Sequence, residues 1–183
     1  MIIKEFDYLM KDGRKAHVRS PREEDVMDVL DLVHAVASET HFLMNYPEEC
    51  DRYTPEGEKA LFERVNSSEY EAMLLCLVGA KPAGICSVNF NNKIKTRHRA
   101  SVAISLLHDY WGQGLGTRLM QEMIEIAKGR EYVSQIELDF IEGNTRARAL
   151  YEKMGFRITG VKPNAIRLKD GTMLNEYSMI LYV

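Results

Sequence analysis

The stretch from Ser101 to Lys128 constrains the fold of this chain more than any other. An apolar run, SVAISLL, leads to three glycines at alternate positions, Gly112, Gly114 and Gly116. Apolar residues then recur at the spacing of one helix face to the end of the stretch. The pattern predicts a strand, a glycine-rich loop and a helix in direct succession.

Such a unit can bind an anion. Glycine lets the backbone adopt positive φ and approach a ligand closely. The first N–H groups of a helix have no partner within it, and the helix dipole makes that end electropositive. Consecutive free N–H groups form a cradle for phosphate. The loop therefore predicts a phosphorylated ligand, although a glycine-rich turn without any ligand is the plainer alternative.

Two common phosphate-binding loops do not fit these residues. A nucleoside-triphosphate loop ends in Gly-Lys-Ser/Thr, whereas here Gly116 is followed by Thr117 and Arg118. A dinucleotide fingerprint has glycines at its first, third and sixth places, and Thr117 holds the sixth place counted from Gly112. A third interpretation remains, namely a loop that holds the diphosphate of coenzyme A.

A second block of sequence narrows the choice. Residues 144–156 read NTRARALYEKMGF. Together, WGQGLGTRL and the pattern N-x-x-A-x-x-L-Y-x-x-x-G-F resemble the two signature blocks of the GCN5-related N-acetyltransferase (GNAT) superfamily. The order of elements agrees with that resemblance from about residue 16 to 182. One departure is Trp111, which stands where the family usually has Arg or Gln, so phosphate contacts are expected from the loop backbone.

Composition excludes several other classes. The chain has 183 residues, 45% of them apolar, and a net charge of −3, which gives no general attraction to nucleic acid or to an anionic membrane. No apolar run has the length of a membrane span. Cys50, Cys76 and Cys86 form neither a disulfide framework nor a zinc pattern. We expect one cytoplasmic domain over residues 1–183, without a metal ion and without a nucleic-acid or membrane partner.

Periodicity and turn signals predict an α/β fold with a single mixed sheet flanked by about four helices. The resemblance implies that this sheet is mostly antiparallel and has about six to seven strands. This is the acyl-CoA N-acyltransferase fold that the resemblance implies. Ser20 is expected to cap a first helix that reaches about Ser38. Residues 70–78 and 83–90 are expected to form a hairpin with a four-residue connection. Further strands are expected at 2–9, 16–20, 134–140, 157–169 and 173–182, and further helices at 55–66 and from Asn144 or Thr145 through Met154.

The resemblance implies an N-acetyltransferase that moves the acetyl group of acetyl-CoA directly to a primary amine. Tyr151 corresponds to the family tyrosine that protects or protonates the coenzyme sulfur. A free thiol has a pKa of about 8.5 and a tyrosine of about 10, so a tyrosine is a plausible proton donor to a thiolate. The alternative is a core tyrosine whose hydroxyl is satisfied elsewhere.

The general base is open between three groups. Many family members carry a glutamate on the strand before the loop, and this chain has none between Ala100 and Leu107. Asp139 matches a position where some protein N-terminal acetyltransferases of the family carry a glutamate base. Glu39 is a second candidate, and a water chain is a third. Either carboxylate could instead be a solvated surface group.

The resemblance also assigns the coenzyme contacts. Main-chain groups near the end of the strand face the pantetheine arm, loop N–H groups face the diphosphate, and an asparagine contacts the coenzyme arm. The expected binding residues are Leu106, Gln113, Gly114, Leu115, Gly116, Thr117, Asn144, Ala147 and Tyr151. The acceptor, a small amine, an amino-acid derivative or a protein amine, is expected between residues 38–55 and the tail strands. Homodimers are common in the family, so a homodimer is a further expectation.

Two rival functions follow from the same residues. The first is a non-catalytic acyl-CoA sensor that keeps the cradle; the missing acid before the loop favours it, and Tyr151 opposes it. The second is a nucleotide-dependent enzyme, which the missing lysine of the loop disfavours.

Overall fold

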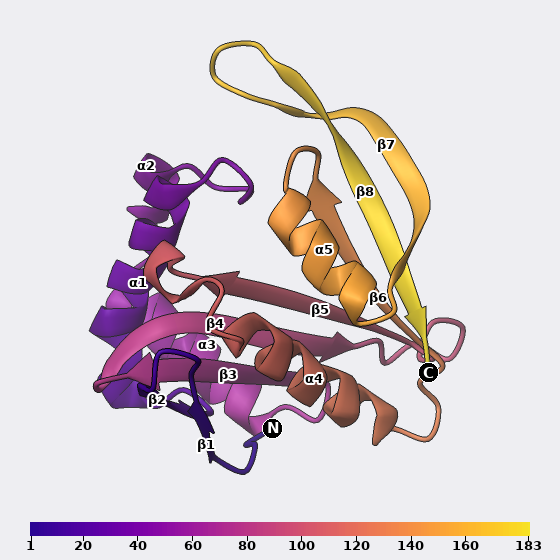
Figure 1. Ribbon diagram of the computed structural model, residues 1–183. Helices are drawn as coiled ribbons and strands as arrows, with labels where there is room; N and C mark the ends of the chain where they lie inside the picture. The colour runs from indigo at the N-terminus through magenta and orange to yellow at the C-terminus, as the bar shows by residue number, and fades with distance from the viewer.

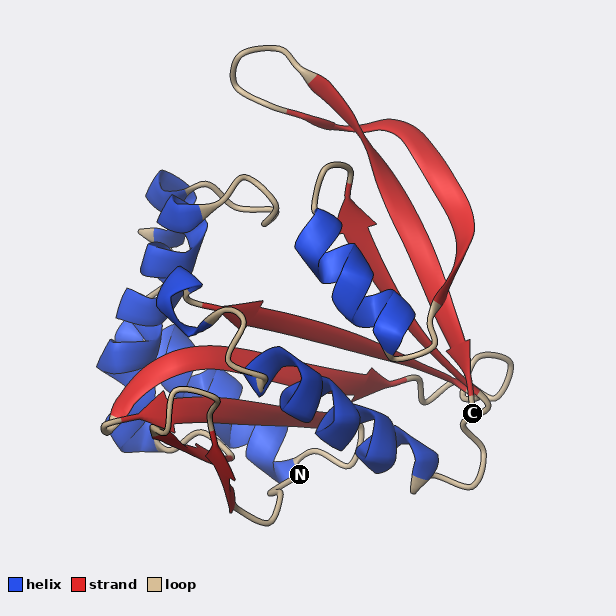
Figure 2. Cartoon of the chain, in the orientation of Figure 1, coloured by secondary structure: helices blue, strands red, loops and turns tan.

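The computed structural model describes residues 1–183 and contains one eight-stranded sheet with helices on both faces (Figures 1 and 2). The strand order is β1-β2-β3-β4-β5-β6-β8-β7, and every neighbouring pair is antiparallel except β5 and β6. The strands are β1 (Phe6–Leu9), β2 (Lys15–Arg19), β3 (Glu71–Val78), β4 (Lys81–Phe90), β5 (Arg99–Leu106), β6 (Gln135–Ile141), β7 (Arg157–Arg167) and β8 (Met173–Tyr182).

Five α-helices and two short 3₁₀ helices complete the fold. They are η1 (Glu23–Asp25), α1 (Val26–Glu39), α2 (Pro47–Cys50), α3 (Pro55–Ser67), η2 (His108–Tyr110), α4 (Leu115–Lys128) and α5 (Thr145–Lys153). The predicted fold class is confirmed, but the strand and helix counts were too low. The single turn of α2 was missed because four residues are too few to show a helical period.

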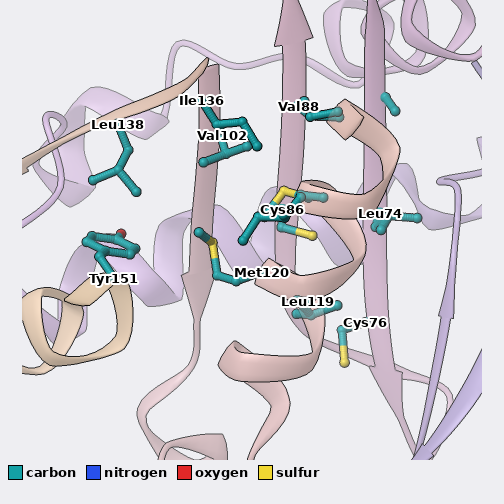
Figure 3. Close-up of a cluster of buried hydrophobic side chains, with 14 of the residues drawn as sticks. Leu74, Cys76, Cys86, Val88, Val102, Leu119, Met120, Ile136, Leu138 and Tyr151 are labelled. Atoms are coloured by element: carbon teal, nitrogen blue, oxygen red, sulfur yellow. The ribbon is translucent and has the colours of Figure 1, made fainter. Parts of the chain in front are cut away.

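The sheet separates two apolar clusters. On one face, shown from the α4 side in Figure 3, Leu119 and Met120 of α4 pack toward Cys86 of β4, and Tyr151 of α5 belongs to the same cluster. On the other face, α1 and α3 cover a smaller cluster that includes Phe62. Strand β3 alternates between the two clusters, because successive side chains of a strand point to opposite faces. None of the helices combines the length and the apolar character needed to cross a membrane.

The start of the first helix was predicted wrongly. Ser20 is not its cap: the Ser20 hydroxyl accepts the Ile3 N–H at 2.9 Å. The helical segment begins at η1 instead, where the Asp25 carboxylate accepts the Arg22 N–H at 2.7 Å. The Asp25 carboxylate is held in place by two hydrogen bonds from buried Arg19. The local sequence pattern gives no sign of this pair.

The predicted four-residue connection between β3 and β4 is also wrong. The strands extend to Val78 and from Lys81, and only Gly79 and Ala80 lie between them, at φ of +59° and +65°. Two residues at positive φ match the right-handed twist of a hairpin. Elsewhere the turns and caps follow the local sequence: Thr54 caps α3, and Gly155 after α5 and Gly171 between β7 and β8 adopt φ of +94° and +89°.

The parallel pairing of β5 and β6 is short. The ladder joins only Arg99–Ser101 of β5 to Gln135–Glu137 of β6. Beyond it the two strands diverge, as Figure 1 shows, and α4 and α5 follow from their diverging ends. The sheet therefore opens where the predicted glycine loop begins.

Candidate active site

A cavity of about 730 Å³ lies in this opening between β5 and β6. It brings together segments that are far apart in the chain: the end of α1 and the loop after it, β5, the glycine loop, β6 and α5. The lining residues are Tyr8, Lys11, Val36, Thr40, Phe42, Leu43, Met44, Val102, Ala103, Ile104, Ser105, Leu106, Tyr110, Trp111, Gly112, Gly114, Gly116, Thr117, Arg118, Gln121, Asp139, Phe140, Asn144, Arg146, Ala147, Ala149, Leu150, Tyr151 and Lys153.

The glycine loop has the backbone that an anion cradle needs. Gly112 and Gly114 adopt φ of +75° and +88°, and Gly114 is the N-cap of α4. A Cβ on Gly114 would lie 2.2 Å from the Tyr8 hydroxyl, so a side chain there would strain the backbone and would have to displace Tyr8. The free N–H groups of the first turn of α4 begin at this point, beside the cavity.

Two of the predicted loop residues do not line the cavity. The side-chain oxygen of Gln113 accepts the Asp12 N–H at 3.2 Å and so turns toward the β1–β2 turn. Leu115 is fully buried in the core. The remaining predicted contacts, Leu106, Gly114, Gly116, Thr117, Asn144, Ala147 and Tyr151, all line it. Gln113 and Leu115 could therefore reach a ligand only through their backbone.

Gly84 supports the site from the neighbouring strand and could not be singled out from the sequence. It pairs with Leu106 at the end of β5. A Cβ on Gly84 would lie 2.2 Å from Leu106 Cδ2 and 2.5 Å from the Ser105 carbonyl oxygen. Glycine at this position therefore lets β4 support the end of β5 that lines the cavity.

Asp139 and Tyr151 lie on opposite sides of β6. Along this strand Leu138 and Phe140 point into the core under α5, so Asp139 points to the other face. Tyr151 lies on α5, and its ring centre is 6.3 Å from that of Phe140. Both residues line the same cavity. The arrangement can present a carboxylate and a phenol to a ligand from two directions.

The environment of Tyr151 suits a hydrogen-bond donor. The residue is 8% exposed, and its hydroxyl makes no hydrogen bond within the protein. Burial raises the pKa of Tyr151 to about 12. The hydroxyl therefore stays protonated at neutral pH. The alternative of a core tyrosine satisfied by another protein group does not match this geometry.

The two candidate bases differ in their surroundings. Asp139 is exposed, and its Oδ1 accepts the Ser178 hydroxyl at 2.5 Å. Glu39 ends α1 and does not line the cavity. Its Oε2 accepts the His108 N–H at 2.8 Å, which supports η2. Of the two carboxylate residues, only Asp139 lines the cavity.

Asn144 caps α5 and also lines the cavity. Its Oδ1 accepts the Ala147 N–H at 3.1 Å and caps α5. Because a side-chain amide also has two donor hydrogens, the NH₂ group of Asn144 is free for the cavity, which the residue lines. No cluster of three or more His, Cys, Asp or Glu side chains could hold a metal ion.

The sequence model of the acetyltransferase (GNAT) family matches residues 37–156, from the end of α1 to just before β7. The chain belongs to the GNAT family. This confirms the family predicted from the two motifs. The description of the family agrees with the predicted class of enzyme, an acetyltransferase.

Individual GNAT relatives agree with the fold. The L-amino acid N-acetyltransferase AaaT of Escherichia coli (strain K12) is 26% identical over 106 residues, which are 58% of this chain and 65% of that enzyme. A GNAT acetyltransferase of Streptococcus pneumoniae has a TM-score of 0.85 at 25% identity, over 92% of this chain and 99% of that one. YncA from Salmonella typhimurium, solved with its cofactor acetyl-CoA, has a TM-score of 0.73 at 18% identity, over 90% and 92% of the two chains.

Trp111 distinguishes this GNAT loop from the usual pattern. Its indole N–H donates to the Leu106 carbonyl oxygen at 2.9 Å, and the His108 ring packs against it with centres 4.5 Å apart. Arg146 of α5 lies on the indole, with its guanidinium carbon 4.9 Å from the ring centre. Arg146 could not be singled out from the sequence, because nothing in its local pattern shows that it meets a residue 35 positions earlier.

Proposed function

We propose that this protein transfers the acetyl group of acetyl-CoA directly to a primary amine, in a complex that holds both substrates. One observation carries the proposal: a GNAT glycine loop with free helix N–H groups opens into the same cavity as the unpaired hydroxyl of Tyr151. The continuous sheet from β1 to β7 supports one N-acetyltransferase domain over residues 1–183.

The residues that fit the donor lie on the side of α4 and α5. The N–H groups from Gly112 to Thr117 would hold the diphosphate, as helix N-termini hold anions. The end of β5 and the amide of Asn144 would position the pantetheine arm. The Tyr151 hydroxyl would donate to the sulfur as the thioester bond breaks, which limits the charge that develops there. Acetyl-CoA supplies the activated acyl group, so no covalent enzyme intermediate is required.

The acceptor would approach the other side of β6. Thr40, Phe42 and Met44, which follow α1, line the cavity together with Asp139. These side chains fit an amine with an apolar substituent, and the Asp139 carboxylate could take a proton from that amine. Because the E. coli relative is an L-amino acid N-acetyltransferase by name, L-amino acids are the first acceptors to test, followed by other small amines and by protein α- and ε-amines.

Binding and turnover together test this function. Acetyl-CoA at about a hundredfold its dissociation constant should stabilise the fold by about 2.7 kcal/mol, which for a chain of this size raises Tm by roughly 5–10 °C. ATP and NAD at the same concentration should not. A panel of amines should then release free thiol from acetyl-CoA. If acetyl-CoA raises Tm but no amine releases thiol from it, the protein is an acyl-CoA sensor instead. If only ATP raises Tm, both the acetyltransferase and the sensor are rejected.

Asp139 is proposed as the general base, and its removal should change the pH dependence. In Asp139→Asn the acidic limb of kcat should flatten, and kcat at neutral pH should fall about a hundredfold or more. Glu39→Gln is the matched control, and it should leave that limb in place because the Glu39 carboxylate accepts a backbone N–H outside the cavity. If Asp139→Asn keeps the acidic limb of the wild type, Asp139 is not the base. If the acidic limb is lost in Glu39→Gln, Glu39 is the base.

A further inference from the structure

An unpaired arginine faces the glycine loop across the cavity. Two arginines line the cavity. Arg118 is paired with Glu122 at 2.7 Å, whereas Arg146 forms no ion pair with any carboxylate of the protein. Arg146 lies in the first turn of α5, on the opposite side of the opening from the loop. Its guanidinium is therefore free to bind an anion between α5 and the loop.

The indole of Trp111 fixes where this guanidinium lies. The indole is held by its N–H donor bond to the Leu106 carbonyl oxygen and by the His108 ring. Arg146 rests on the indole at 4.9 Å. Trp111 directly precedes Gly112, so this contact brings the cation to the beginning of the cradle. A cation–π contact at an exposed site is weak, so the guanidinium can turn to a phosphate without a large loss.

We propose that Arg146, presented by Trp111, binds the diphosphate of the coenzyme from the side opposite the loop. This inference rests on the proposed function. The Trp111–Arg146 pair would supply from α5 the cation that this loop lacks at position 111. Arginine suits the task because its planar fork can donate two hydrogen bonds to one phosphate and because its charge does not depend on pH. Arg146 is thus a coenzyme-binding residue, with Trp111 as its positioning residue.

Three donors that differ in their phosphates test the assignment. We expect Arg146→Gln to raise the Kd of acetyl-CoA about tenfold to a hundredfold, the usual effect of losing a charge-assisted hydrogen bond. The Kd of acetylated 3′-dephospho-CoA should rise by the same factor, because it keeps the diphosphate. The Kd of S-acetylpantetheine, which has no diphosphate, should stay within about twofold of the wild-type value. Binding can be followed by calorimetry.

The outcomes separate this inference from the function on which it rests. Arg148→Gln is the control, because Arg148 lies on the same helix and pairs with Glu152 outside the cavity; it should change none of the three Kd values. If Arg146→Gln weakens all three donors equally, or none, the inference is wrong. A penalty that disappears with the 3′-dephospho donor would move Arg146 to the 3′-phosphate and overturn the diphosphate assignment. A wild-type protein that binds no acetyl-CoA would overturn the proposed function and this inference with it.

The partnership of the two side chains has its own test. Trp111 is the only tryptophan of the chain, so its fluorescence emission should change when acetyl-CoA binds. Trp111→Leu removes the aromatic surface and should raise the Kd of acetyl-CoA severalfold. In the double variant with Arg146→Gln the two losses should be less than additive, since both disrupt one contact. Fully additive losses would show that Trp111 does not act through Arg146.

Discussion

Replacing Tyr151 with Phe lowers kcat at least about a hundredfold and leaves the Kd of acetyl-CoA nearly unchanged, if the hydroxyl donates to the leaving sulfur. The change removes one oxygen from a residue that is 8% exposed and keeps the ring that packs beside Phe140. Stability should therefore change little. Steady-state kinetics with a good amine acceptor, together with a binding isotherm for acetyl-CoA, measure the two quantities separately.

The raised pKa of Tyr151 limits how readily its hydroxyl can transfer a proton to the sulfur. A hydroxyl with a pKa of about 12 cannot simply give its proton to a thiolate with a pKa near 8.5. That transfer alone is uphill by about 5 kcal/mol. Tyr151 should instead donate a hydrogen bond to the sulfur and pass its proton only as another is supplied from the acceptor amine. Because the phenol is protonated well above pH 9, any basic limb of kcat below that pH must come from another group.

Tyr177→Phe is the matched control for this prediction. Tyr177 also packs on Phe140, stacked with ring centres 5.2 Å apart, and does not line the cavity. Its hydroxyl makes a long bond of 3.5 Å to Glu142. Turnover in this variant should remain near the wild-type value. Equal losses in the two variants would mean that kcat responds to packing around Phe140, and an active Tyr151→Phe enzyme would remove Tyr151 from the mechanism.

The second large effect concerns stability and the buried pair of Arg19 and Asp25. Two hydrogen bonds of 2.6 and 2.8 Å join the guanidinium to the carboxylate, and the two residues are 8% and 6% exposed. Asp25→Ala leaves the charge of Arg19 buried without its partner and removes the acceptor of the Arg22 N–H. The free energy of unfolding should fall by about 3–5 kcal/mol. Urea unfolding followed by circular dichroism measures it.

A nearby exposed pair provides the control. Glu23 in the same short helix pairs with Lys59 at 2.6 Å, and both side chains are largely exposed. Glu23→Gln should cost no more than about 1 kcal/mol, since solvent screens such pairs. If Asp25→Ala and Glu23→Gln lower the free energy of unfolding by similar amounts, the buried pair stabilises the fold no more than the exposed pair does.

The stability supplied by Asp25 should depend on pH with a definite sign. Burial alone would raise the pKa of Asp25, but the bonds from Arg19 and from the Arg22 N–H outweigh it and hold the pKa below its usual value. A lowered folded-state pKa contributes stability that is complete above the unfolded pKa, near 3.9, and is lost as the pH falls through the folded value. The difference between wild type and Asp25→Ala should stay constant from about pH 5 to 8 and shrink below about pH 4.

Local patterns were sufficient to predict much of this fold. The helix after the glycine loop and the alternation of β6 follow from residues a few positions apart, so their periodicity predicts them directly. The start of α1 could not be predicted in this way, because Asp25 caps η1 through a network that includes Arg19 on a neighbouring strand. The expected cap at Ser20 failed for the same reason, since Ser20 is bonded to Ile3.

The candidate site likewise contains residues that the sequence could predict and residues that it could not. Its loop and Tyr151 belong to contiguous motifs and could be identified from the sequence. Gly84 and Arg146 could not, because each has meaning only beside a partner distant in the chain, Leu106 for Gly84 and Trp111 for Arg146. Gly84, for example, is an ordinary strand glycine until Leu106 is placed against it. The sequence also left the base open, and only the folded chain separates Glu39, which supports η2, from Asp139 in the cavity.

The short ladder between β5 and β6 has a consequence for how recognition begins. Past Ser101 and Glu137 the facing edges of the two strands no longer share hydrogen bonds, so peptide groups there point into the opening without a neighbouring strand. A ligand whose arm carries amide groups can satisfy them in the manner of an added strand. The coenzyme would then bind as a missing piece of the sheet, and the two halves of the molecule would be joined more firmly with it than without it.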